Sequence, residues 1–238
     1  MLEGIVYKSI DYKETSKIVY LYTRGGKVSV KVSGLNKKNN NLKSFPITGN
    51  IVKYNYSDTI VPTLIDYDMI LSPLNHSDNL EYLEALRVVI LVLNQLPEDI
   101  NDYRTYNFVK NILTNIAENP KKILSTFLIK MLYSFGVTPN LKECANCKKK
   151  DNLVFFDVDA GVSLCSSCGP NVGNYEDWYK FYFAKVSYLN VEDSNYEELF
   201  NEIMRYYENF FHLSLKIKFI WQNSNYLIKL NKHDEVEE

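Results

Sequence analysis

Four cysteines, the only ones in the chain, constrain its fold more than any other feature of the sequence. They form two Cys-x-x-Cys pairs, Cys144 with Cys147 and Cys165 with Cys168, and seventeen residues separate the pairs. Two such pairs at this separation are typical of a site that binds zinc through four thiolates. Because four protein ligands leave no open coordination position, the sequence predicts one structural zinc ion per chain and no catalytic one.

Other interpretations of the cysteines stay open. Two disulfides would require an oxidising compartment, a redox Cys-x-x-Cys motif is usually single, and a degenerate site would hold no metal. The segment Met1–Val6 lacks the basic and apolar regions of a secretory signal, and no run of eighteen apolar residues suggests a membrane span. We therefore expect a cytoplasmic protein with reduced thiols.

Positive charge is concentrated at the N-terminal end of the sequence. Residues 1–54 carry ten lysines and arginines but three acids, a net charge of +7, although the whole chain has a net charge of −2. The remaining residues therefore carry −9. A basic segment on a near-neutral protein favours a polyanionic partner, although a solvated lysine-rich surface is an equally good interpretation of charge alone.

The first seventy residues have the pattern of a small β-barrel. Short runs rich in Ile, Val and Tyr are separated by turn-forming residues, and the segment 24–27 predicts a hairpin. Pro62 indicates an edge position or a bulge, and the polar segment 33–44 is predicted to be an exposed loop. Five strands favour an OB-fold, with an SH3-like barrel as the alternative. The expected strands are 4–10, 16–23, 27–33, 49–56 and 60–71.

Helical periodicity begins after Pro73, with Ser77 or Asp78 as the expected N-cap. Leu80, Leu83, Leu86, Ile90, Leu93 and Leu96 predict the apolar face of the first helix. Gly136 is expected to end the third helix, whose apolar side is Leu124, Phe127, Leu128, Met131, Leu132 and Phe135. The expected helices span 80–96, 103–117, 122–135, 175–186 and 196–213, followed by a frayed tail over 231–238.

The cysteine segment interrupts the helices. Residues 153–157 predict a strand and 159–161 a turn, so we expect a β-hairpin clip of the zinc-ribbon type. The predicted fold class is a multidomain α+β protein. Its expected domains are an OB-fold DNA-binding barrel over 1–74, a helical domain over 75–140 and 171–238, and a four-cysteine zinc clip over 141–170 inserted in the helical domain.

Catalytic motifs are missing from the sequence. It contains no P-loop, no GxSxG, no HExxH and no GxGxxG motif. The three histidines, His76, His212 and His233, lie away from the cysteine pairs in the sequence, and we do not expect them to be zinc ligands or catalytic groups. The sequence therefore predicts a protein that is not an enzyme.

Several segments together resemble the RecO family of bacterial DNA repair proteins. They include 12–23, 26–28 and 32–34 in the barrel, and Leu132, Gly136, Pro139 and Leu141 before the cysteines. Phe155 or Phe156 and Gly161 continue the pattern between the cysteine pairs. The similarity covers nearly the whole chain in the same order. The chain departs from the family in having a less basic segment after Gly34, at 35–38, and only a partial match at 212–216.

The resemblance implies a recombination mediator that binds single- and double-stranded DNA and anneals complementary strands. It also implies that the protein works with RecR to load RecA onto strands coated by single-strand-binding protein, whose C-terminal tail it would contact, in the cytoplasm at the nucleoid. The basic charge and aromatic residues of the barrel separately favour phosphate contacts and base stacking. The predicted DNA contacts are Lys13, Lys17, Arg24, Lys31, Lys37, Lys38 and Lys43.

Two alternatives belong to different functional classes. The first is a protein-interaction adaptor that uses the barrel as a peptide platform. The second is a fragment of an NAD-dependent DNA ligase, which also combines an OB barrel with a four-cysteine zinc clip. The ligase would require an adenylated Lys-x-Asp-Gly motif, which the sequence lacks.

Overall fold

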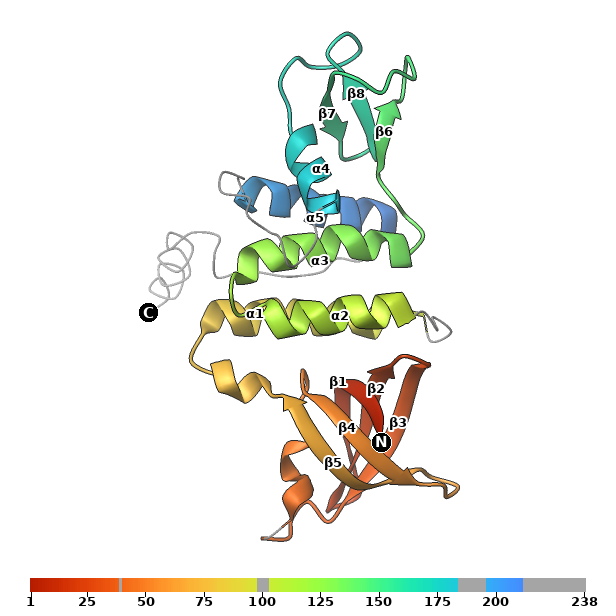
Figure 1. Ribbon diagram of the computed structural model, residues 1–238, viewed down its shortest axis with the longest axis vertical. Coiled ribbons are helices and arrows are strands. Elements are labelled where there is room, and N and C mark those ends of the chain that lie inside the picture. Colours follow the sequence, from red (N-terminus) through yellow and green to blue (C-terminus); the bar gives the residue numbers. More distant parts are fainter. Residues whose placement is uncertain (39, 98–102, 184–195, 212–238) are drawn as a thin grey trace, which may run out of the picture. The chain divides into compact units, whose positions relative to one another are not determined.

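A computed structural model describes residues 1–38, 40–97, 103–183 and 196–211 (Figure 1). The chain clusters into two compact units, Met1–Pro120 and Lys121–Glu238, the second through its described residues. The first unit joins the barrel to two helices, so packing groups these helices with the strands. Whether residues 1–74 form a domain by themselves stays a prediction.

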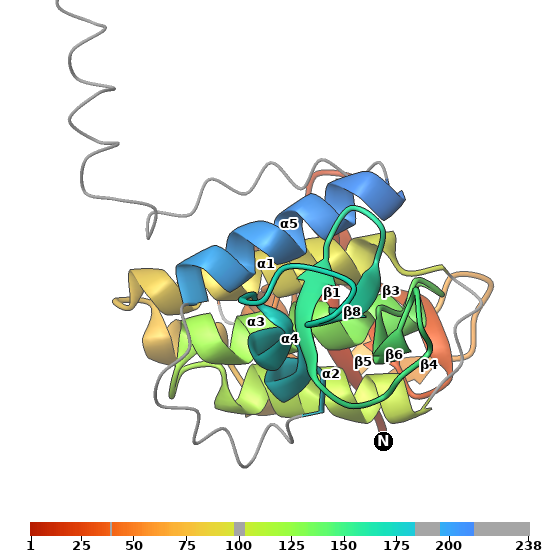
Figure 2. The ribbon, with the colours of Figure 1, turned by 90° about the horizontal axis from the view of Figure 1, so that it is seen from above.

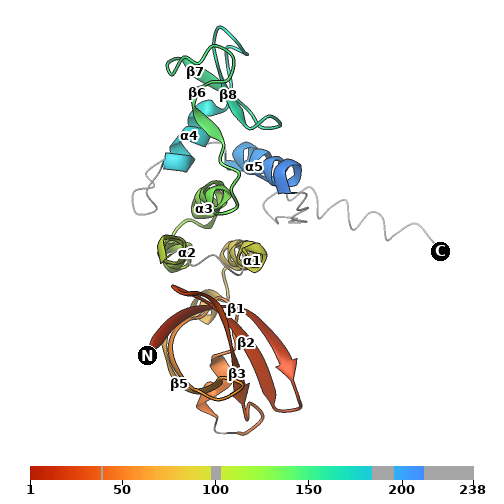
Figure 3. The ribbon, with the colours of Figure 1, turned by 90° about the vertical axis from the view of Figure 1, so that its right-hand side faces the viewer.

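The first unit is built on a closed barrel of five strands, β1 (Leu2–Tyr12), β2 (Ser16–Thr23), β3 (Gly26–Ser33), β4 (Ile51–Ser57) and β5 (Thr63–Leu71). Their order around the barrel is β1-β2-β3-β5-β4. Figure 3 shows the barrel from a direction at right angles to that of Figure 1. Antiparallel pairing of β1 with β4 and a short parallel contact between Lys31 and Thr63 close it. This arrangement is that of an OB-like barrel, so the predicted fold class is confirmed.

The barrel core follows from alternation along the strands. Side chains of alternate residues point inward, so valines and leucines meet in the centre and their polar neighbours face outward. Phe45 closes the core and its ring lies 5.1 Å from that of Tyr67 and 6.3 Å from that of Tyr54. The buried members of this core are Val6, Val19, Leu21, Val30, Val32, Phe45, Val52, Tyr54 and Leu64.

Two local predictions in the first unit need correction. The segment 33–44 is not wholly a loop, because it ends in a 3-10 turn, η1 (Asn41–Ser44), which the Asn40 side chain caps. The helix α1 (Leu80–Gln95) begins after Asn79, whose Oδ1 accepts a hydrogen bond from the Tyr82 amide at 3.0 Å. Ser77 and Asp78 are not the cap, since a 3-10 turn, η2 (Pro73–His76), occupies the preceding residues and Ser77 ends it.

The helices α1 and α2 (Tyr103–Asn115) pack with the barrel in the first unit. The predicted apolar face of α1 is only partly right, because Leu80 is 63% exposed while Val88, Val89 and Val92 are buried. On β3, Lys27 extends to the end of α1, where its Nζ donates to the carbonyls of Asn94 at 3.2 Å and Leu96 at 2.6 Å. A lysine suits this position because the last helical carbonyls lack partners and carry partial negative charge.

The second unit contains α3 (Pro120–Ser134), α4 (Tyr175–Phe183) and α5 (Tyr196–Phe211). The sequence places the end of α3 correctly. Gly136 has a φ of +77°, its amide donates to Tyr133, and the Val137 amide donates to Leu132, which is the Schellman motif. On α5, Tyr207 is buried and its hydroxyl donates to the Leu128 carbonyl at 2.9 Å. The predicted ends of the last two helices, at 186 and 213, and the tail over 231–238 lie outside the described residues.

A three-stranded sheet carries the cysteines. The predicted hairpin is confirmed, with β7 (Leu153–Asp157) antiparallel to β8 (Val162–Cys165). A third strand that the sequence did not reveal, β6 (Asn140–Cys144), runs parallel to β8. Figure 2 shows this sheet from above.

Aromatic side chains join this sheet to its helices. The rings of Phe156 on β7 and Trp178 on α4 lie 4.3 Å apart, and Tyr206 on α5 lies 5.6 Å from Trp178. Gly161, between β7 and β8, has a φ of +69°, and a Cβ there would lie 3.1 Å from both Phe210 and the Tyr206 hydroxyl. The turn at Gly161 therefore fits only a residue without a side chain.

Within the part of the chain that the structure describes, no helix has both the length and the apolar character needed to cross a bilayer.

Candidate metal centre and nucleic-acid interface

The fold brings the four predicted metal ligands together. The sulfurs of Cys144, Cys147, Cys165 and Cys168 all lie within 4.8 Å of one another, and all four are free thiols. The Sγ atoms of Cys147 and Cys165 are 3.6 Å apart. A tetrahedral ZnS4 site with Zn–S distances of about 2.3 Å has edges of about 3.8 Å, so this arrangement of sulfurs fits the size of a zinc ion.

Two tight turns hold these sulfurs. In the first, the Lys148 amide donates to the Cys144 carbonyl at 3.0 Å, and the Cys144 amide donates to Lys149 at 2.8 Å. In the second, the amides of Cys168 and Gly169 both donate to the Cys165 carbonyl, at 2.9 and 3.0 Å. A Cβ at Gly169 would lie 2.8 Å from that of Leu164, so the second turn has no room for a side chain. Each turn thus presents two sulfurs in a fixed direction.

The thiols influence one another's ionisation. Hydrogen bonds from the backbone amides of Cys147 and Cys165 lower the pKa of Cys144 to about 6. Hydrogen bonds to the neighbouring cysteines Cys165 and Cys147 raise the pKa of Cys168 to about 12. The thiolate of Cys144 therefore forms readily, whereas Cys168 resists ionisation unless a cation offsets the negative charge that it would add. A divalent metal ion supplies that charge, so the chemistry of the donors fits zinc as well as their spacing does.

Histidine does not contribute to this centre within the described residues, where the four cysteines form the single cluster of potential metal ligands. The ring of His76 lies 4.9 Å from that of Tyr82 in the first unit. His212 and His233 lie outside the described residues.

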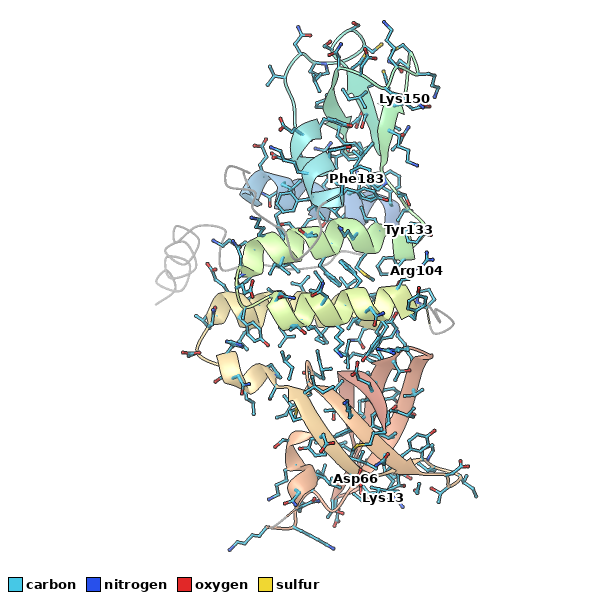
Figure 4. The ribbon with its side chains drawn as sticks, viewed as in Figure 1. Lys13, Asp66, Arg104, Tyr133, Lys150 and Phe183 are labelled. Atoms are coloured by element: carbon cyan, nitrogen blue, oxygen red, sulfur yellow. The ribbon has the colours of Figure 1, made fainter. Side chains whose placement is uncertain are left out.

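A second candidate site is a group of cations at one end of the barrel. The turn between β1 and β2 carries Lys13, which Figure 4 labels at the end of the barrel remote from α1 and α2. The segment after β3 is attached to this turn, because the Leu35 amide donates to Thr15 at 2.9 Å and Asn36 donates to Glu14 at 3.0 Å. We call the five cations gathered here the lysine end: Lys13, Lys17, Lys37, Lys38 and Lys43.

The lysine end has an ordered backbone beneath exposed side chains. Asn40 closes the segment that carries Lys37 and Lys38, because its Nδ2 donates to the Gly34 carbonyl at 2.6 Å. Lys43 on η1 reaches back to the Lys38 carbonyl at 3.4 Å. Asp11, near the end of β1, forms an ion pair with Lys17 at 2.7 Å, and Glu14 lies in the same turn as Lys13. The five cations of the lysine end outnumber these two acids.

Two predicted contacts lie elsewhere on the barrel. Lys31 lies on β3 with its side chain outside the barrel, since Val30 and Val32 on either side are buried in the core. Arg24 lies in the turn between β2 and β3, at the opposite end of β2 from the lysine end, with its guanidinium 6.0 Å from the Tyr106 ring. The structure thus groups five of the seven predicted residues, and whether any of them contacts DNA stays a prediction.

Some candidate contacts were missing from the sequence-based set. Lys8 is exposed on β1, with its Nζ 5.3 Å from the Tyr20 ring, and Lys53 is exposed on β4. Both occupy outward positions of alternating strands, which is the signal that could have identified them. Aromatic side chains are less available than expected, because Tyr7, Tyr22 and Tyr54 are buried while Tyr12 and Tyr56 are 38% and 39% exposed.

Comparisons with known proteins cover both units. Residues 1–60 match the family model described as "Recombination protein O N terminal" and residues 76–201 match "Recombination protein O C terminal". The chain is 28% identical over 235 residues to the DNA repair protein RecO of Bacillus subtilis, with 91% of each chain covered. It is 29% identical over 182 residues to the RecO protein of Mycoplasma mycoides, with 70% of each chain covered.

Proposed function

Because the chain belongs to the RecO family of DNA repair proteins, we propose that it is a recombination mediator that acts on DNA without catalysing a covalent step. In this proposal it binds single- and double-stranded DNA and anneals complementary single strands. With RecR it would help to load RecA onto strands coated by single-strand-binding protein, whose C-terminal tail it would contact. It would do so in the cytoplasm, at the nucleoid.

The observation that carries the DNA-binding part is the lysine end. Its cations come from the β1–β2 turn, β2, the segment after β3 and η1, and they lie together because hydrogen bonds tie the segment after β3 to the β1–β2 turn. Cations that neutralise phosphates displace condensed counterions, and this release drives binding without regard to sequence. Annealing requires the same property, since two polyanionic strands must approach each other.

We propose that Cys144, Cys147, Cys165 and Cys168 hold one structural zinc ion. The ion would offset the charge of four thiolates and join the two turns that flank β7 and β8. Four protein ligands leave it no position for a substrate, so its role is to fix the sheet on α4 and α5.

Charge reversal at the lysine end tests the proposal. We expect the double substitution Lys37→Glu and Lys38→Glu to weaken binding of a single-stranded oligonucleotide at low salt. If about four phosphates are neutralised, the slope of log K against log salt is about −2.8, and losing two of these contacts brings it to about −1.4. The matched control is Lys149→Glu with Lys150→Glu, which makes the same change of charge at exposed residues of the second unit.

Equal weakening by the two double variants would show that net charge alone is responsible, and would remove the lysine end from the site. Strand annealing by the purified chain, with and without RecR, tests the mediator role directly. A chain that binds neither single- nor double-stranded DNA would favour the protein-interaction adaptor instead. The ligase alternative is set aside because both units match RecO models.

A further inference from the structure

The barrel has a second feature at the end opposite the lysine end. A cleft of about 610 Å³ lies between the first residues of β1, the β2–β3 turn, β3 and β4. We call it the mouth cleft. The strand β2 runs from the lysine end to the mouth cleft and has eight residues. At about 3.3 Å per residue, the two features are roughly 25 Å apart. The two features are therefore distinct surfaces of the same unit.

The walls of the mouth cleft are apolar and its charged groups are mainly cations. Leu2 and Val28 are 51% and 39% exposed, and Arg24 and Lys53 are the cations among the residues that line the cleft. The acid among the lining residues is Glu3, whose Oε1 accepts hydrogen bonds from Lys110 at 2.7 Å and Tyr106 at 2.8 Å. Lys110 therefore balances the charge of Glu3, and Arg24 and Lys53 provide two further cations at the rim of the cleft.

A tyrosine pair gives the cleft a flat wall. Tyr54 and Tyr56 on β4 both line it. Their ring centroids are 6.2 Å apart, and the ring planes are inclined by 29°. Tyr54 is buried, while Tyr56 is 39% exposed. A partly exposed ring fixed against a buried one is a rigid surface for a second flat ring, because stacking costs it little side-chain freedom.

This combination of groups suits one nucleotide. A base is a flat ring that stacks on tyrosine, and its phosphate is an anion that arginine and lysine bind. The volume lies in the range of pockets for a single small ligand. A base inside a duplex is already stacked on both faces and would have to be extruded before it could enter.

Building on the proposed DNA binding, we propose that the mouth cleft holds one unstacked nucleotide of a single strand. Its base stacks on Tyr56, and Arg24 and Lys53 neutralise the adjacent phosphates. The lysine end would contact the backbone of single strands and duplexes alike, so the mouth cleft is the part of the barrel that distinguishes single strands from duplexes.

The test uses the full chain with three probes at one salt concentration: an oligothymidine, a duplex of equal length, and an abasic single strand of that length. We expect Tyr56→Ala to weaken oligothymidine binding about tenfold and to leave the duplex and abasic affinities within about twofold. Tyr56→Phe keeps the ring and should retain binding of all three probes. Tyr133→Ala, which removes an exposed tyrosine of the second unit, is the matched control.

A second readout does not depend on affinity. A 2-aminopurine base in the single strand should lose fluorescence on binding to the wild type and to Tyr56→Phe, but not to Tyr56→Ala. Equal losses for oligothymidine and duplex, or an unchanged oligothymidine affinity in Tyr56→Ala, would overturn the proposal. If the wild type binds no DNA at all, the proposed function fails as well, so the two failures are distinguishable. Thermal melting of each variant shows whether the barrel remains folded.

Discussion

The two units each contain a β-sheet, and the two sheets are supported in very different ways. The barrel closes on itself, so each of its five strands has neighbours on both sides and a continuous apolar core inside. The sheet β6-β8-β7 has three short strands, and the residues buried in it include two of the cysteines, Cys144 and Cys165. A closed barrel can rest on hydrophobic burial, whereas a sheet this small needs a metal ion or helices to hold it.

The units differ again in how a half-buried carboxylate joins their elements. Burial disfavours ionisation of Glu3 in the first unit, but hydrogen bonds from Lys110 and Tyr106 and the charge of Lys110 outweigh it, so its pKa is lowered. In the second unit burial raises the pKa of Glu202, although Trp178 and Asn174 donate to it at 2.7 and 2.5 Å. Lys110 accounts for the difference, because the neutral donors beside Glu202 do not offset the free-energy cost of desolvating its charge.

The largest expected effect comes from breaking the metal centre. We expect Cys144→Ser to abolish zinc binding and melt the cysteine sheet, because structural zinc sites contribute on the order of 10 kcal/mol to folding. Zinc content per chain and thermal melting should fall together, and a chelator should act on the wild type in the same way. Ser167→Ala, at an exposed residue between the second pair of cysteines, is the control. Retention of one zinc ion by Cys144→Ser would contradict the assignment.

A cavity in the barrel core should lower the free energy of unfolding by less than loss of the metal, and it should affect the first unit. Phe45 is fully buried, and Phe45→Ala removes its contacts with Tyr54 and Tyr67, which we expect to lower the free energy of unfolding by about 3–5 kcal/mol. Phe45→Leu should lose less because it leaves a smaller cavity. Urea unfolding measures the cost, and zinc content should not change. Loss of zinc in Phe45→Ala would mean that the units do not unfold separately.

The sequence was sufficient where local patterns determine structure. The spacing of the cysteines predicted that their four sulfurs come together, and alternation identified the strands of the barrel. The strand β6 was missed because five residues carry too little periodicity, and its parallel partner β8 lies across a hairpin. Arg24 was grouped with the lysines by charge alone. Successive turns of an antiparallel meander lie at opposite ends, so the order of strands could have separated Arg24 from Lys13.

The pH dependence of stability should distinguish the two carboxylates. Glu202 has a raised pKa in the folded state, so its contribution is present below the unfolded value of 4.5 and is lost as the pH rises through the folded pKa. Glu3 has a lowered pKa, so its contribution is present above 4.5 and is lost as the pH falls through the folded pKa. Acidification from neutral pH towards 4.5 should therefore strengthen the second unit through Glu202, and further acidification should weaken the first through Glu3.

Denaturant unfolding between pH 7 and pH 3 measures how the free energy of unfolding changes with pH. The variants Glu202→Gln and Glu3→Gln each lack the contribution of one carboxylate. We expect each change in stability with pH to be small, because neither carboxylate is fully buried. Protonation of the cysteines also weakens zinc binding at low pH, so each variant is compared with the wild type at equal zinc occupancy. Identical pH profiles for the wild type and Glu202→Gln would contradict the raised pKa.

The smallest expected effect concerns the balance of charge at the lysine end. Asp11 pairs with Lys17 at 2.7 Å, but its side chain is 86% exposed, so the ion pair adds little to stability. Asp11→Asn should leave the melting temperature nearly unchanged and free Lys17 for a phosphate, which raises single-strand and duplex affinity about two- to threefold at low salt. The gain should vanish at high salt. If instead only single-strand affinity rose, the lysine end would share the selectivity that we assign to the mouth cleft.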